Sequence, residues 1–146
     1  MAVKFEFVSA FICERVLMEA DGVTSAIRIV DIFFVPEGAP EEAIVPFYLI
    51  VLLKTVPVPD EEIRIGVTLI RANGERERLP DPPGQPFKLQ LFSGDPSIPG
   101  GFSLILHANI KPRNMGTCFL EIDVDGEPVT RVPFTLRRPI QAEQKN

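Results

Sequence analysis

The chain has 146 residues, which is enough for one domain and too few for two of ordinary size. Hydrophobic residues make up 45% of it and charged residues 24%, a composition that excludes a disordered or fibrous protein. The 15 basic residues are scattered among 20 acidic ones, and the net charge is −5. We therefore expect that the protein does not bind nucleic acid, because such binding needs clustered basic residues.

From the N-terminus onward, the predicted elements are strands. Fifteen prolines interrupt most windows in which a helix would fit. Turn dipeptides such as Asp21-Gly22, Asn73-Gly74 and Asp125-Gly126 separate segments rich in β-branched and aromatic residues. The first segment also fits a helix face, and we favour a strand there. The predicted strands lie near residues 5–19, 23–35, 44–56, 62–72, 75–79, 86–92, 102–111, 116–124 and 129–137.

Eight or nine short strands with little or no helix predict an all-β fold. Such a chain forms a single antiparallel β-sandwich, which is the fold class we expect, or a barrel. The domain is predicted to cover residues 1–140, and a polar C-terminal tail covers residues 141–146.

Two of the predicted strands are apolar on both faces. One covers residues 44–53 and the other residues 27–35, whereas a two-layer sandwich buries only one face of each sheet. The second face is covered either by the protein's own loops and strand ends or by another subunit. We expect a homo-oligomer, and the predicted interface residues are Phe47, Leu49, Val51, Leu53, Val30, Ile32 and Phe34.

Later strands alternate between apolar and polar residues. Over residues 102–110 and 118–125, one face is expected in the core and the other mostly in water. Glu121, Asp123 and Asp125 form an acidic row on the second face. We interpret the row as a solvated surface, and a Ca²⁺ site is the alternative because carboxylate oxygens are ligands for that ion.

Residues that could carry catalysis are sparse. His107, the single histidine, is predicted on a polar strand face with no local motif beside it, and Cys13 and Cys118 are expected to be buried thiols. We therefore predict no enzyme, no catalytic residue, no metal site and no cofactor. Arg131, Arg137 and Arg138 give the last strand a basic end. We interpret this basic end as charge that protects an edge strand from unwanted pairing. The alternative is that it binds a phosphate or an acidic partner.

The N-terminal twenty residues lack the pattern of a signal peptide, because charged residues interrupt any apolar segment. The longest apolar run, residues 43–53, contains a proline and is shorter than the roughly 20 residues that span a bilayer. We expect a soluble, cytoplasmic protein with no membrane partner.

Both ends of the chain carry a recognisable pattern. The first is Phe11-Ile12-Cys13-Glu14, then Asp21-Gly22 and Asp31-Ile32-Phe33. The second runs from Gly116 through Phe119-Leu120-Glu121-Ile122-Asp123-Val124-Asp125-Gly126-Glu127-Pro128 to Pro133-Phe134-Thr135-Leu136. These segments resemble a family of small bacterial proteins of unknown function with an immunoglobulin-like β-sandwich. The resemblance implies that architecture and carries over no catalytic or binding residue.

The function predicted from the sequence is that of a non-enzymatic cytoplasmic interaction or assembly module, self-associating through apolar sheet faces. An unidentified protein partner is possible at the loops. The alternative is a sandwich or barrel that binds a small molecule or a cation, at the acidic row or at the mouth around residues 80–86.

Overall fold

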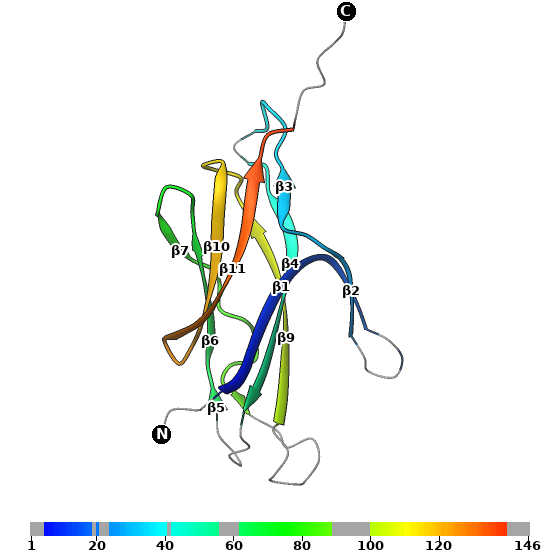
Figure 1. Ribbon diagram of the computed structural model, residues 1–146, viewed down its shortest axis with the longest axis vertical. Coiled ribbons are helices and arrows are strands. Elements are labelled where there is room, and N and C mark those ends of the chain that lie inside the picture. Colours follow the sequence, from blue (N-terminus) through cyan, green and yellow to red (C-terminus); the bar gives the residue numbers. More distant parts are fainter. Residues whose placement is uncertain are drawn as a thin grey trace, which may run out of the picture.

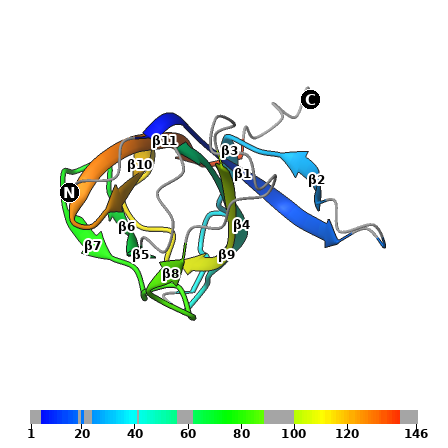
Figure 2. The same ribbon diagram turned by 90° about the horizontal axis from the view of Figure 1, so that it is seen from below.

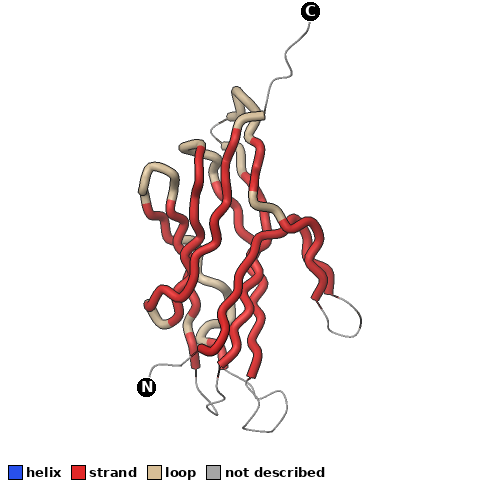
Figure 3. The backbone as a smooth tube through the Cα atoms, viewed as in Figure 1, coloured by secondary structure: helices blue, strands red, loops and turns tan. Residues whose placement is uncertain are grey.

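The computed structural model describes residues 5–18, 20, 24–40, 42–55, 62–88 and 100–139. Within these ranges the chain is all-β and contains no helix, so no helix there is long and apolar enough to cross a membrane (Figure 1, Figure 3). The predicted C-terminal tail lies outside the described residues. The strands are β1 (Phe5–Met18), β2 (Thr24–Ile29), β3 (Ile32–Phe34), β4 (Val45–Thr55), β5 (Glu62–Ile63), β6 (Ile65–Ile70), β7 (Arg76–Arg78), β8 (Phe87–Lys88), β9 (Gly100–Ile110), β10 (Gly116–Val124) and β11 (Glu127–Arg137).

The strands form two larger sheets and one small one. The first sheet has the order β2-β1-β4-β9, the second has the order β3-β11-β10-β6-β7, and β5 pairs with β8. Two predicted strands are each divided in two, which accounts for eleven strands in the described ranges where eight or nine were expected. The segment of residues 24–34 leaves the first sheet after β2 and joins the second as β3, which pairs with β11 in parallel. The pairing is therefore mixed and not wholly antiparallel.

The two larger sheets pack against each other and share one hydrophobic core. Strands β4, β6, β10 and β11 each place alternate side chains into it, and for β10 this confirms the alternation predicted over residues 118–125. Phe47 of β4 and Phe134 of β11 meet across the core with ring centroids 6.1 Å apart, and Phe33 of β3 packs against both rings. The aromatic contacts tie the short edge strand β3 to the centre of the molecule.

The central position of β4 explains why it is apolar on both faces. Strands β1 and β9 flank it, and its residues Phe47, Leu49, Val51 and Leu53 point into the core, each with at most 1% of its surface exposed. On the opposite face Ile50 lies between Phe11 and Ile105 and is 4% exposed. Those four residues were predicted to form a subunit interface, and the structure assigns them to the core instead.

The second half of β1 leaves the body of the molecule. Residues Phe5–Cys13 pair with β4, whereas Cys13–Met18 pair with β2. Seen along the strands, this β1–β2 hairpin extends away from the two layers (Figure 2). We call it the arm, defined as the described residues 13–18 and 24–29.

Candidate functional site

Two of the three residues in the predicted acidic row are buried, contrary to the expectation of a solvated surface. The Glu121 side chain is 8% exposed and that of Asp123 is 10% exposed, although both point away from the core. Three arginines cover them. Arg76 donates to Glu121 Oε1 at 2.5 Å, Arg131 donates to Glu121 Oε2 at 2.8–2.9 Å, and Arg78 donates to Asp123 Oδ2 at 2.5 Å.

We call these ion pairs the ladder, which consists of Arg76, Arg78 and Arg131 with Glu121 and Asp123. A glycine in β6 makes room for it. Strand β7 is separated from β10 by β6, so Arg78 must cross β6 to reach Asp123. It crosses over Gly66, the residue paired with Asp123, where an added Cβ would collide with the guanidinium group. The fully exposed third member of the row, Asp125, accepts a hydrogen bond from the Arg64 backbone N–H at 2.9 Å.

The pKa of Glu121 shows which effect dominates in the ladder. Burial alone would raise the pKa of this carboxyl, but hydrogen bonds from Arg131 and Arg76 and the charges of both guanidinium groups outweigh burial. The pKa of Glu121 therefore lies below its ordinary value, and the carboxylate stays charged and paired. A carboxylate held in this way is a poor ligand, and no group of residues in the described ranges is arranged to hold a metal ion. We assign the ladder a structural role, which is to fix the edge strand β7 to the sheet.

The candidate nucleophiles and the histidine lie apart from one another. Cys118 is fully buried in the core on β10, and Cys13 is fully buried on β1 in the other sheet. Burial raises the pKa of the Cys118 thiol against the opposing effects of the Ala72 backbone and Arg71. His107 is exposed on β9, with its ring 4.8 Å from that of Tyr48. The structure brings none of these groups together as a catalytic pair.

Both thiols are expected to resist modification in the folded protein. Neither sulfur is accessible, and the raised pKa of Cys118 lowers its fraction of reactive thiolate. A chromogenic disulfide reagent should label neither cysteine under native conditions and both cysteines in denaturant. Rapid labelling of Cys118 in the folded protein would contradict the position of β10 in the core.

The predicted mouth near the proline loop is present as a mostly apolar cavity. It has a volume of about 480 Å³ and lies between β9 and the loop of residues 79–83, with Leu49 and Val67 at its base. The nearby Gln85 side chain bonds to both the backbone N–H and the C=O of Ile65, at 3.2 and 2.7 Å. These bonds satisfy the backbone of Ile65 on the side of β6 away from β10, where the pairing with β7 does not reach.

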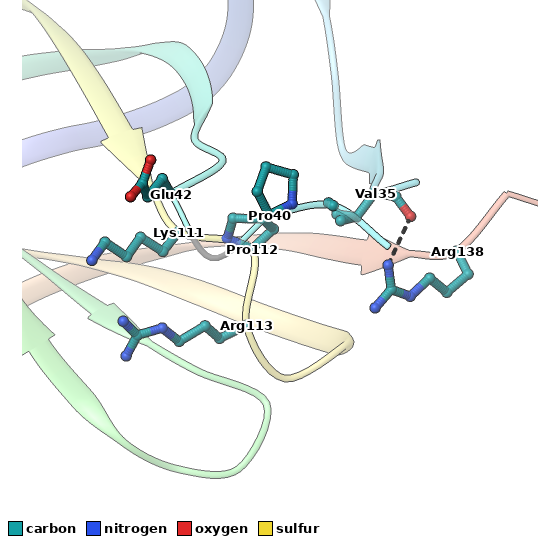
Figure 4. Close-up of a pocket in the computed structure, with 8 residues that line it drawn as sticks. Val35, Pro40, Glu42, Lys111, Pro112, Arg113 and Arg138 are labelled. Carbon is teal, nitrogen blue, oxygen red and sulfur yellow. Dashed lines mark hydrogen bonds between the residues drawn. The ribbon is translucent and has the colours of Figure 1, made fainter. Parts of the chain in front are cut away.

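A hollow with a basic lining lies at the end of the molecule where β9 and β11 finish (Figure 4). Its volume is about 430 Å³, and its walls come from the segment between β3 and β4, the turn between β9 and β10, and the end of β11. The lining residues are Val35, Ala39, Pro40, Glu42, Lys111, Pro112, Arg113 and Arg138. Three cations and one carboxylate leave this lining with a charge of 3 − 1 = +2, in a chain of net charge −5.

The predicted basic end of the last strand is thereby divided among different sites. Arg131 belongs to the ladder, whereas Arg138 lines the hollow and donates to the carbonyls of Val35 and Pro36 at 3.3 and 2.6 Å. Arg137 is exposed and lies outside the hollow. Lys111 and Arg113 were not singled out by the sequence, because they are distant from Arg138 along the chain and stand in no motif.

Exposed apolar side chains gather on the arm and on the strand that follows it. Leu17 is 49% exposed and Ile29 is 67% exposed, and the pairing of β1 with β2 places both on the same face of the arm. Of the predicted interface residues, Ile32 and Phe34 are 39% and 58% exposed on β3. Val30 is half-buried against the core.

Comparison with known proteins adds little to this geometry. No protein-family model matches the chain, and no curated protein does. Among solved structures, the chain is similar to the Pseudomonas fluorescens alkylpurine DNA glycosylase AlkC bound to DNA containing an abasic site analog, with a TM-score of 0.41 and 16% sequence identity. The likeness covers 73% of this chain and 27% of the glycosylase. At this level it carries no argument about the function of the chain.

The exclusion of nucleic acid as a partner is nevertheless withdrawn. It assumed basic residues scattered among acidic ones, whereas three basic residues line one hollow of the folded chain. The physical reason lies in the fold, because folding gathers Lys111, Arg113 and Arg138 in one place and the net charge of the chain does not reveal such a cluster.

Proposed function

We propose that this chain is a non-enzymatic interaction module that pairs with a second copy of itself through the outer edge of β2, the edge strand of its sheet among the described residues. The observation that carries the proposal is the arm itself, a two-stranded ribbon that extends from the body with Leu17 and Ile29 exposed. A ribbon of two strands is at best marginally stable alone in water. A partner that adds strands to it would therefore stabilise it.

The edge of β2 carries little of the usual protection against strand pairing over residues 24–27, before a positive φ of 55° at Arg28 interrupts the regular strand. Exposed edges are commonly blocked by proline, lysine or unpaired charge. The β2 sequence Thr-Ser-Ala-Ile-Arg-Ile contains neither proline nor lysine, and its one charge, Arg28, lies 3.4 Å from Glu14 on the neighbouring strand. Another strand would therefore approach this edge with little electrostatic opposition.

A second copy is the occupant that we favour. Every copy presents the same edge, and antiparallel pairing of β2 with β2 about a two-fold axis joins two ribbons into one of four strands. The face that carries Leu17 and Ile29 then continues across the joint, with Arg15 between these two residues. Ile32 and Phe34 extend the apolar surface along the chain toward the body.

We further infer that the two packed sheets form an immunoglobulin-like β-sandwich and that the protein acts in the cytoplasm. The shared core, and a segment that leaves one sheet and joins the other, support the sandwich. The pair of buried thiols is consistent with a reducing compartment. Kinship with the bacterial family of unknown function remains part of the same proposal.

Light scattering on a sizing column tests the self-association. Over about a hundredfold range of concentration, the mass should rise from that of the 16.2 kDa chain toward twice that value, because dimer formation follows mass action. Ile29→Glu should raise the concentration at which the monomer converts to dimer by at least about tenfold. It places a negative charge in each of the two β2 strands that would pair.

The matched control is Ile44→Glu. Ile44 is 55% exposed and lies outside the arm, so this variant makes the same chemical change at similar exposure. It should associate as the wild type does. A wild-type mass that stays at one chain throughout would overturn the proposal, and so would equal effects of the two variants.

A further inference from the structure

We propose that the basic hollow is a binding site for a ligand that carries more than one phosphate group. The inference is independent of the arm and concerns a different end of the molecule. It starts from the three cations that line the hollow, because none of them forms an ion pair with an acidic side chain of the described ranges. By contrast, the arginines of the ladder are each paired with a carboxylate.

Hydrogen bonds to the Lys111 carbonyl fix the turn that carries Lys111 and Arg113. Buried Arg71 donates to the Lys111 carbonyl at 2.8 Å, and its other nitrogen lies 3.0 Å from Glu77. The Arg113 backbone N–H also donates to the Lys111 carbonyl, at 2.9 Å. The backbone of the turn is therefore fixed by polar contacts, and both of its cationic residues line the hollow.

The opposite wall is equally constrained. The Val35 N–H donates to the Arg137 carbonyl at 2.8 Å, which fixes this segment to the end of β11. Two further backbone bonds, Ala39 N–H to Pro36 and Ala43 N–H to Pro40, fold the segment into successive turns. One nitrogen of Arg138 contacts the carbonyls of Val35 and Pro36, which orients the planar group and leaves its other donors for a ligand.

The placement of the charges favours a ligand with several anionic groups. Lys111 and Arg113 extend along one side of the hollow, and Arg138 lies on the other side beside Val35 (Figure 4). The volume of about 430 Å³ is typical of a small-molecule site. Arginine forks match phosphate oxygens in pairs, and lysine binds phosphate as a point charge. Glu42 at the rim would disfavour anions that approach from its side.

Calorimetric titration with tripolyphosphate tests the site, with inorganic phosphate and citrate in parallel. We expect saturable tripolyphosphate binding with a Kd below about 1 mM, and weaker binding of inorganic phosphate. Arg113→Ala and Lys111→Ala should each weaken it by about tenfold, since hydrogen bonds to charged groups contribute on that scale. Wild type and variants should have the same unfolding midpoint without ligand, because neither side chain makes a structural contact in the described ranges.

Arg137→Ala is the matched control, because it removes the same charge from the neighbouring position outside the hollow. It should bind tripolyphosphate within about twofold of wild type, which separates a local site from general charge attraction. A labelled single-stranded oligonucleotide forms the second arm of the experiment. Tighter binding of the oligonucleotide than of tripolyphosphate, lost in Arg113→Ala, assigns the phosphates to a polymer backbone, whereas the reverse order assigns them to a soluble ligand.

Three results would overturn the inference. The first is no saturable binding by the wild type of either tripolyphosphate or the oligonucleotide. The second is equal loss in Arg113→Ala and Arg137→Ala. The third is citrate binding as tight as that of tripolyphosphate, which would contradict the assignment of phosphate.

Discussion

Leu49→Glu should leave the protein unfolded or aggregated, whereas Leu52→Glu on the same strand should leave it folded. Leu49 is 1% exposed in the core, and a carboxylate there has no partner, so burying it costs several kcal/mol even after its pKa rises. A domain of this kind has a stability of about 5–15 kcal/mol, so the change removes much or all of it. Urea unfolding followed by circular dichroism measures the difference.

Leu52 is the matched position because it lies on the other face of β4 and is 36% exposed. Its replacement by Glu should change the free energy of unfolding by less than about 1 kcal/mol. The comparison of the two variants also distinguishes a core face of β4 from a subunit interface. If Leu49→Glu gives a folded monomer of undiminished stability, Leu49 belongs to an interface as the sequence predicted, and the assignment of this face to the core fails.

Glu121→Gln should lower the free energy of unfolding at pH 7 by about 1–2 kcal/mol. The amide keeps the size of the carboxyl but loses the charge that pairs with Arg76 and Arg131, both of which are about half-exposed and regain water. The pKa of Glu121 is lowered in the folded protein, so its contribution is fully present above the unfolded value of about 4.3. The contribution of Glu121 to stability is lost as the pH falls from the unfolded pKa through the pKa of Glu121 in the folded protein.

The pH dependence distinguishes this effect from a packing defect. Wild type and Glu121→Gln should therefore converge in stability as the pH falls below the folded pKa of Glu121, whereas a packing defect would persist at every pH. Glu127→Gln removes the same charge from an exposed position at the start of β11, and it should match the wild type at pH 7 and at pH 3 within about 0.5 kcal/mol. A constant deficit of Glu121→Gln across the pH range would show that the ion pairs do not stabilise the fold.

Local patterns in the sequence predicted the strands well, because each strand is defined by its own turns and periodicity. The alternation over residues 102–110 places Leu104, Leu106 and Ile110 toward the core as expected. Sheet order depends on contacts between distant segments, and the sequence does not show that β4 is central. Without that information the face with Phe47, Leu49, Val51 and Leu53 was attributed to a subunit interface, whereas it packs in the core.

Charged residues were harder to interpret, because their partners are remote in sequence. Arg76 and Arg78 alternate with acidic residues in the run of residues 75–78, and both pair with carboxylates 45 positions away. One signal in the sequence could have predicted these ion pairs. Arg76 and Arg78 are two residues apart, and so are Glu121 and Asp123, as partners on parallel or antiparallel strands would be. The basic hollow carried no such signal, since its cations come from two turns and a strand end that only the complete fold brings together.

The central claim is that the edge of β2 pairs with another copy, and hydrogen exchange of the β2 amides tests it most directly. At a protein concentration where the light-scattering mass is that of a dimer, the amides of Thr24–Ile29 that face away from β1 should be protected from exchange, and they should lose protection on dilution. The amides of β10, which is central in its sheet, should exchange at the same slow rate at both concentrations. Fast exchange of the β2 edge at every concentration would contradict the pairing.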